Sequence, residues 1–489
     1  MAADSAQARH TATLFVLALC FATALLLRLF LLAHARPAVY IVEFSVFKAD
    51  PSWRFSQDDV RRCAAAAGVE PEDVSLLCKL ARRSGLGDAT AVPPDSLKLV
   101  LDNLGQRKPG TEMARREFEA TCFPCVEELL AKTGVTAGQI GFVITNSSLF
   151  NPTPSLSAAV INRFKLRDDV INYALGGMGC SAGVVALDLA RQMLQLRPGS
   201  YALIVSHENI TNNYYTGRDK SMLLPNALFR SNSAAVLLSS RPADKRKSKY
   251  TVRHIVRTIM AADDEAYGCV WQTEDPEHIQ GVRLRKELIS VAGRCVTRNV
   301  GRVAPLVLPV SELGKCAAGA LVRAVLSAAP ARLASLAPER WQRPYAPDFS
   351  KAFDAVCIHT GGRGVIDSME QSLGLGRGMV EASRAALFRF GNTSSCSVWY
   401  ELAYLESFNG GLRRGAKVWQ VAFGSGFKCN SAVLVANRRV ADAHAAWDAF
   451  DRSKMYAQLD EIDREVAASR ARRAAERAAA GEAPDAGGP

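Results

Sequence analysis

Two series of short β-branched segments, each interrupted by glycine-rich turns, follow the same order along this chain. Apolar runs of four to eight residues predict strands, and a 3.6-residue periodicity predicts the helices between them. In the first series, residues 140–145, 170–174 and 201–205 are expected strands and 180–196 is an expected helix. In the second series, residues 355–358, 386–390 and 417–423 are expected strands and 399–405 is an expected helix. This order predicts an α/β fold of two duplicated halves. The turns at 180 and 392 would then occupy equivalent strand-to-helix corners near one central site.

A mostly apolar run at residues 11–33, interrupted by Arg28, precedes both series. Its length is sufficient for one membrane-spanning helix. A cleaved signal peptide is the alternative, because Arg9 precedes the run and residues 33–35 resemble a cleavage site, but the run exceeds a usual signal core. We therefore expect an uncleaved N-terminal transmembrane segment within residues 1–38, as a single span or a tight hairpin.

The remaining domain boundaries follow from the two series. The first half is expected at residues 39–300 and the second at 301–450. Residues 451–489 are rich in Ala, Arg and Glu, and then in Gly and Pro. Their composition predicts a charged helix that continues into a disordered tail.

Charge and cysteine usage narrow the class of protein. A formal net charge of +12 suits a coenzyme A thioester, an anionic membrane face or nucleic acid, and charge alone does not choose among them. The twelve cysteines follow no repeating spacing, which is typical of reduced thiols in a cytosol-facing protein. Cys122 and Cys125 lack a second pair, so we expect no metal site. The basic run 245–249 is interpreted as a solvated loop between strands.

The clearest candidate for chemistry is Cys180, in the segment Gly-Gly-Met-Gly-Cys-Ser-Ala-Gly at 176–183. A thiol at a helix start meets unpaired backbone N–H groups and the positive end of the helix dipole, which favour the thiolate. The glycines let a substrate carbonyl approach the backbone closely. Taken alone, however, this turn favours a buried structural cysteine.

Two further polar residues favour a catalytic role for Cys180 over a structural one. His359 closes an apolar strand before a Thr-Gly-Gly turn, and Asn392 lies in a Gly-Asn-Thr-Ser-Ser corner. Singly, the histidine would be read as a structural residue and the asparagine as a helix cap. Together with Cys180, at three glycine-flanked strand ends, they suit thioester condensation. The cysteine accepts the acyl group, and two neutral donors stabilise an enolate.

The chain resembles the plant-type 3-ketoacyl-CoA synthases, the condensing enzymes of very-long-chain fatty acid elongation, in the thiolase-like superfamily shared with chalcone synthases. Similar blocks occur in the same order over nearly the whole body. They lie at residues 40–44, 148–155, 176–183, 208–211, 305–309, 357–359, 389–395 and 424–431.

The resemblance implies a thiolase-like, five-layered αβαβα fold and a catalytic triad of Cys180, His359 and Asn392. It also implies a homodimer in the endoplasmic reticulum membrane, facing the cytosol, with a ketoacyl-CoA reductase, a dehydratase and an enoyl-CoA reductase as partners. Acyl-CoA and malonyl-CoA would be the substrates. We expect no metal, cofactor or nucleic acid to take part.

The implied reaction is a decarboxylative Claisen condensation that yields a 3-oxoacyl-CoA, CoA and carbon dioxide. The Cys180 N–H would hold the oxyanion, and the backbone at Gly179, Gly424 and Gly426 would support it. A soluble type III polyketide synthase would use the same three residues and is the nearest enzymatic alternative. A catalytically silent elongase scaffold is the alternative from another class.

The chain departs from the family pattern near this triad. The family usually has histidines at the positions of Ile259, Ala355 and Phe388, and a Gly-Gly pair where this chain has Asn232 and Ser233. Such changes can alter how His359 is oriented. The sequence therefore predicts neither the rate nor the preferred acyl chain length and saturation.

Overall fold

The computed structural model describes residues 36–102, 110–328, 337–343 and 345–479. The expected span at 11–33 and the end of the tail lie outside these ranges. The chain divides into two compact units, Met1–Ala38 and Val39–Pro489, and the second is described below. Within the described ranges, no helix is both long and apolar enough to cross a membrane.

Nine strands form one mixed sheet in the order β11-β12-β13-β8-β1-β7-β6-β4-β5. Their bounds are β1 (Tyr40–Val46), β4 (Ile140–Asn146), β5 (Ile171–Leu175), β6 (Tyr201–His207), β7 (Ser233–Ser239), β8 (Tyr250–Ile259), β11 (Ala355–Ile358), β12 (Lys417–Gly424) and β13 (Lys428–Ala436). Two ribbons pair β2 (Arg54–Phe55) with β3 (Thr90–Ala91) and β9 (Val270–Glu274) with β10 (Gln280–Leu284).

The two ends of this sheet repeat one pairing pattern. β4 is parallel to β6, which is antiparallel to β7, which is antiparallel to β1. Likewise β11 is parallel to β12, which is antiparallel to β13, which is antiparallel to β8. A short β1–β8 pairing joins the two sets. The second set thus begins with β8, which lies before residue 300 in the chain. The expected boundary between the two halves at residue 300 stays a prediction.

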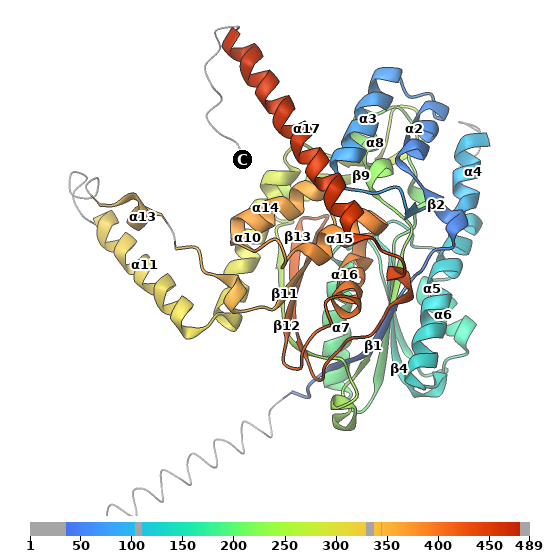
Figure 1. Cartoon of the computed structure of the whole chain (residues 1–489). Coiled ribbons are helices and arrows are strands. Elements are labelled where there is room, and N and C mark those ends of the chain that lie inside the picture. The colour runs from blue at the N-terminus through green and yellow to red at the C-terminus, as the bar shows by residue number, and fades with distance from the viewer. Residues whose placement is uncertain (1–35, 103–109, 329–336, 344, 480–489) are drawn as a thin grey trace, which may run out of the picture. The chain divides into compact units, whose positions relative to one another are not determined.

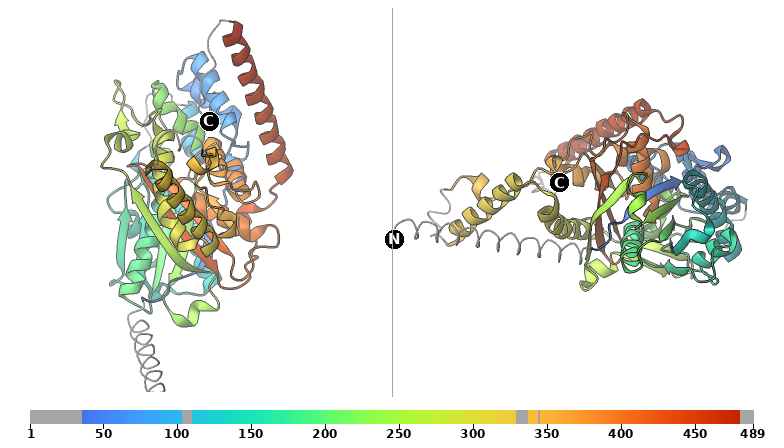
Figure 2. Two further views of the ribbon diagram at one scale, coloured as in Figure 1. Left: turned by 90° about the vertical axis from the view of Figure 1, so that its left-hand side faces the viewer. Right: turned by 90° about the horizontal axis from the view of Figure 1, so that it is seen from below.

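Helices cover both faces of the sheet (Figures 1 and 2). On β6, Ala202 and Ile204 pack in the core cluster that contains α7, whereas Leu203 and Val205 pack in the cluster that contains α5. α7 also contacts β12 and β13 of the other half. The bounds are α2 (Gln57–Ala66), α3 (Pro71–Arg83), α4 (Pro94–Asp102), α5 (Thr111–Thr133), α6 (Leu156–Phe164), α7 (Ala182–Leu196), α8 (Lys220–Leu228), α9 (Asp264–Gly268), α10 (Leu288–Val307), α11 (Val310–Ala328), α13 (Glu339–Gln342), α14 (Arg363–Leu373), α15 (Glu381–Phe390), α16 (Ser397–Ser407) and α17 (Arg452–Ala479).

One predicted strand is wrong. Residues 386–390 belong to helix α15 and not to a strand. The segment Arg-Ala-Ala-Leu consists of good helix formers, and the buried residues Ala382, Ala385 and Ala386 are spaced to share one helix face. Gly391 ends the helix with a φ of 72°, which a glycine adopts without strain. Asn392 therefore follows a helix, and its corner is not equivalent to the corner at Cys180.

Candidate active site

Cys180 lies directly before Ser181, the N-terminal cap of α7, at the end of a turn that follows β5. Gly177 and Gly179 have φ values of 63° and 70° in this turn, a left-handed conformation that favours glycine. The Ser181 hydroxyl accepts a hydrogen bond of 3.0 Å from the Asn430 side chain of β13. The start of α7 is thereby tied to the second half of the sheet.

A loop at the end of β12 packs backbone to backbone against this turn. A Cβ atom added to Gly179 would stand 2.5 Å from the amide nitrogen of Ser425, and one added to Gly424 would stand 2.5 Å from the amide nitrogen of Cys180. No side chain fits between these two segments. The structure thus brings together the residues expected to support an oxyanion, and that role stays a prediction.

Lys428 braces the same turn from β13. Its ammonium group donates to the backbone oxygen of Met178 over 3.1 Å, although the residue is only 8% exposed. Gly426 adjoins this side chain, since a Cβ atom there would lie 3.5 Å from the Lys428 Nζ. Burial lowers the pKa of the Lys428 ammonium.

His359 follows β11 at the carboxyl end of that strand, where its N–H donates to the Val421 oxygen of β12 over 2.9 Å. Its Nδ1 lies 2.8 Å from the hydroxyl of Ser397. That hydroxyl donates to the Ser394 oxygen over 2.9 Å, so it accepts from Nδ1–H. In this tautomer, the Nε2 atom carries the lone pair of the imidazole.

Burial keeps both ionisable members of the triad neutral. It raises the pKa of the Cys180 thiol to about 12 and lowers the pKa of the His359 imidazole to about 4. The expectation that the helix start favours a resting thiolate is therefore wrong. Loss of hydration outweighs the stabilisation that the helix terminus offers a charged sulfur atom.

Asn392 is buried between α15 and the chain that follows α8. Its backbone N–H donates to the Leu228 oxygen over 2.9 Å, and its backbone oxygen accepts from the Arg230 N–H over 3.1 Å. The side-chain oxygen accepts from the Ser394 N–H over 2.9 Å. Because its oxygen is engaged, the amide presents its NH₂ group as the free hydrogen-bonding end.

The sequence reasoning missed two residues, Ser394 and Glu208. The Ser394 hydroxyl donates to the Glu208 carboxylate over 3.0 Å, and a hydrogen bond with Ser394 lowers the pKa of Cys180. Ser394 therefore bonds directly to Cys180 and Asn392, and its backbone oxygen accepts from the Ser397 hydroxyl that holds His359. The available signals were the place of Ser394 in the Gly-Asn-Thr-Ser-Ser corner and the place of Glu208 directly after β6. Neither position was distinctive in the sequence.

Glu208 is a buried carboxyl group that also holds a neighbouring loop. It accepts hydrogen bonds of 3.1 Å from the backbone N–H groups of Ser148 and Leu149. Burial raises its pKa. Glu208 thus joins the β4 loop to the Ser394 loop beside Cys180.

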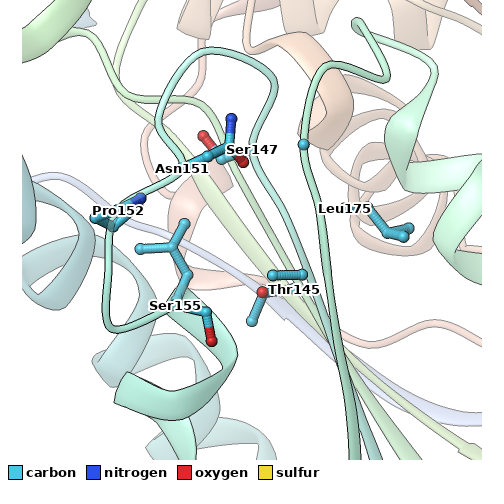
Figure 3. A pocket seen from close by; sticks show the side chains of 9 residues that line it. Thr145, Ser147, Asn151, Pro152, Ser155 and Leu175 are labelled. Atoms are coloured by element: carbon cyan, nitrogen blue, oxygen red, sulfur yellow. The ribbon is translucent and has the colours of Figure 1, made fainter.

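A pocket with a volume of about 250 Å³ opens where β4 and β5 end (Figure 3). Thr145 and Leu175 line it from the two strands, and Asn151 and Pro152 line it from the loop that joins β4 to α6. Cys180 is not among its lining residues, so this pocket does not by itself define an acyl site. Elsewhere in the ranges the structure describes, no group of three or more His, Cys, Asp or Glu side chains is arranged to hold a metal ion.

The three positions at which the family usually has a histidine lie in separate environments. Ile259 ends β8 with 64% of its surface exposed, and Ala355 is buried at the start of β11. Phe388 packs edge-on against Phe450. The replacements therefore change three different surroundings and not one common cluster.

Comparison with known proteins identifies the family of this chain. The sequence profile of the FAE1/Type III polyketide synthase-like protein family matches residues 30–325, and that of the chalcone and stilbene synthases, C-terminal domain, matches residues 340–437. 3-Ketoacyl-CoA synthase 2 of Arabidopsis thaliana is 44% identical over 434 residues, which are 88% of this chain and 78% of the relative. The chain belongs to the 3-ketoacyl-CoA synthase family.

Other members of the family are equally similar. 3-Ketoacyl-CoA synthase 11 of Arabidopsis thaliana is 44% identical over 85% of this chain and 78% of its own. The probable 3-ketoacyl-CoA synthase 20 of Oryza sativa subsp. japonica is 44% identical over 89% and 80%. The chain is therefore an acyltransferase-type condensing enzyme of fatty acid elongation.

Solved structures show the fold. A type III pentaketide synthase from Neurospora crassa has a TM-score of 0.62 at 18% identity and covers 81% of this chain and 99% of its own. CsyB complexed with CoA-SH has a TM-score of 0.61 at 17% identity and covers 81% and 100%. The fold is thus the thiolase-like type III polyketide synthase fold, a mixed α/β architecture with a large sheet.

Proposed function

We propose that this chain condenses a long-chain acyl-CoA with malonyl-CoA and releases a 3-oxoacyl-CoA, CoA and carbon dioxide. The observation that carries the proposal is the position of Cys180. It lies at the start of α7, against the Gly424 backbone, and shares a hydrogen bond with Ser394 of the loop that also binds His359 and Asn392.

The first step transfers the acyl group to Cys180. Nε2 of His359 takes the thiol proton, and the sulfur atom attacks the thioester carbonyl of the acyl-CoA. The carbon–sulfur bond to CoA then breaks, and the departing thiolate recovers the proton from His359. The Cys180 N–H, beside the Gly424 loop, stabilises the oxyanion.

The second step forms the carbon–carbon bond. Malonyl-CoA loses carbon dioxide, and the electron pair of the broken bond forms an enolate on its thioester. The NH₂ group of Asn392 donates to the enolate oxygen, and so does the imidazole of His359, which takes up a proton on Nε2 as malonyl-CoA binds. The enolate carbon attacks the acyl-cysteine, the carbon–sulfur bond breaks, and the released Cys180 thiolate takes up a proton. These residues suffice for every step without a metal or cofactor.

The sheet supports two further parts of the proposal. α7 contacts strands of both halves, which agrees with the five-layered αβαβα arrangement. β5 lies at an edge of the sheet, and its residues Asn172, Tyr173 and Ala174 are exposed. An exposed edge strand can pair with the same strand of a second copy. We propose that it does so in a homodimer, which sedimentation analysis of the detergent-solubilised protein tests.

We also place the enzyme in the endoplasmic reticulum membrane, with its body in the cytosol. The apolar run at 11–33 and the free thiols support this placement. The 3-oxo product requires reduction, dehydration and a second reduction to become a saturated acyl-CoA. We therefore propose a ketoacyl-CoA reductase, a dehydratase and an enoyl-CoA reductase as partners.

One assay tests the proposed reaction. Microsomes that contain the protein receive labelled malonyl-CoA and acyl-CoA primers of graded length, and the products are separated. We expect 3-oxoacyl products that are absent from the Cys180→Ala variant and retained by Cys78→Ala, whose cysteine lies on α3. Products that contain several malonyl-derived units would instead identify a polyketide synthase. If neither kind of product forms, the chain would be a catalytically silent scaffold.

A further inference from the structure

Helix α11 turns its charged side toward the protein. Its only acidic side chain, Glu312, is fully buried and accepts hydrogen bonds from Lys315 over 3.0 Å, Lys351 over 2.8 Å and the Tyr345 hydroxyl over 2.6 Å. The adjacent ammonium groups and hydrogen bonds hold the pKa of the Glu312 carboxyl far below its usual range. Polar contacts therefore fix the base of α11 on the side that faces the body.

The opposite side of α11 is apolar and exposed. Val310, Leu321 and Val325 are 85%, 67% and 61% exposed. They share one helix face with exposed small residues, since positions three, four and seven apart lie on the same side of a helix. This face contains no charged residue, and consists of Val310, Gly314, Ala317, Ala318, Leu321, Ala324, Val325 and Ala328.

This arrangement is the reverse of a helix that faces water, which directs its apolar side inward. α11, yellow in Figure 1, extends away from the sheet and contacts α13. Near the end of this pair, Trp341 is 50% exposed and Tyr345 is 36% exposed. An exposed face of this kind requires a partner that removes it from water.

The chemistry of the surroundings favours a lipid surface as that partner. Residues 310–351 contain six Lys or Arg against three Asp or Glu, an excess of three positive charges that complements anionic headgroups. Trp and Tyr are typical of the membrane–water interface. The apolar face itself has no aromatic or Arg anchor of the kind that dominates protein–protein interfaces.

We propose that the apolar face of α11, as defined above, lies in the interfacial layer of the membrane that holds the N-terminal segment. The inference rests on the proposed anchorage through residues 11–33. The helix lies parallel to the membrane plane, with Leu321 and Val325 among the acyl chains and Trp341 at the level of the headgroups. The catalytic body is thereby held at the membrane at a second point.

Photocrosslinking tests this contact. The full-length protein is reconstituted into vesicles of phosphatidylcholine and phosphatidylserine that contain a lipid with a diazirine in its acyl chain. After irradiation, labelled peptides are identified by mass spectrometry. We expect labels in the peptide that spans 310–328 as well as in the one that spans 11–33. The double variant Leu321→Glu, Val325→Glu should reduce the first label at least fivefold and leave the second unchanged.

A matched control uses another exposed leucine. Leu196, at the end of α7, is 74% exposed, and Leu196→Glu should leave both labels unchanged. Labels at 11–33 without any at 310–328 would overturn the α11 proposal and preserve the anchor. Absence of both lipid labels would contradict the proposed anchorage. Condensing activity is measured separately and tests the proposed reaction.

Discussion

Gly424 and Cys180 are in direct backbone contact, since a Cβ atom added to Gly424 would stand 2.5 Å from the Cys180 amide nitrogen. The two residues come from different halves of the sheet, and their contact places the β12 loop over the nucleophile turn. The approach is possible because neither Gly424 nor Gly179 carries a side chain. The position of the Cys180 N–H thus depends on this pair.

Replacing Gly424 should damage catalysis more than folding. We expect Gly424→Ala to displace the Cys180 N–H and to lower kcat by a factor of about 100, the scale of a lost oxyanion donor. Gly364→Ala is the control, because an added Cβ there meets nothing within 4 Å and Gly364 lies inside helix α14. Condensation rates and thermal unfolding of both variants check this. Unchanged kcat in Gly424→Ala would contradict the proposed role of this backbone contact.

Ser394→Ala should make Cys180 less reactive. The Ser394 hydrogen bond lowers the pKa of the Cys180 thiol, so its loss raises that pKa and reduces the thiolate fraction at any pH below it. We expect Cys180 alkylation by iodoacetamide at pH 8 to slow by about tenfold for each unit of pKa increase. Thr393→Val is the matched control in the same loop, since its buried hydroxyl has no hydrogen-bond partner within the described chain. Equal alkylation rates in both variants would exclude this role for Ser394.

Buried His359 should make the protein less stable in acid. Burial lowers the pKa of its imidazole to about 4, so below pH 6.5 the unfolded chain binds a proton that the folded chain does not. The resulting loss of unfolding free energy grows as the pH falls from about 6.5 to 4 and reaches on the order of 3 kcal/mol. In His359→Gln this part of the loss should disappear. Urea unfolding at several pH values, followed by tryptophan fluorescence, measures the difference, and parallel pH profiles would refute it.

Lys249 should be essential for stability. Its ammonium group is buried and lies 2.5 Å from a Glu43 oxygen, 2.7 Å from Glu406 and 3.0 Å from Asp442. Lys249→Met removes the cation and leaves the fully buried Glu406 carboxylate short of a partner, which we expect to cost about 3–5 kcal/mol.

The neighbouring Lys245 provides the comparison, because it is exposed at the end of a short 3-10 turn. Lys245→Met should change the unfolding free energy by less than about 0.5 kcal/mol. Urea unfolding of the two variants measures both values. Similar small effects would show that the buried ion cluster contributes little.

Local sequence patterns predicted most of the elements around the site. The strands predicted at 140–145, 355–358 and 417–423 are β4, β11 and β12, with bounds within one residue, and the helix at 180–196 is α7. Strand ends and glycine turns are encoded by nearby residues, so a single sequence reveals them.

The segment at 386–390 shows the limit of this reasoning. A short apolar run fits either a buried strand or a buried helix, and periodicity over five residues does not distinguish them. Its position in the second series suggested a strand, but α15 forms there and packs against α16 and β11. The repeat of the strand order is therefore real without extending to every element.

By itself, the sequence determined the duplicated order of the strands and the candidate residues Cys180, His359 and Asn392. Only the tertiary structure decided what surrounds them: Ser394 beside Cys180, the neutral state of the thiol, and the burial of Lys249 in a basic run expected to be solvated. Glycine turns and strand patterns act over a few residues along the chain. Hydration and ion pairing instead depend on which distant segments meet, and those distances exist only in the folded protein.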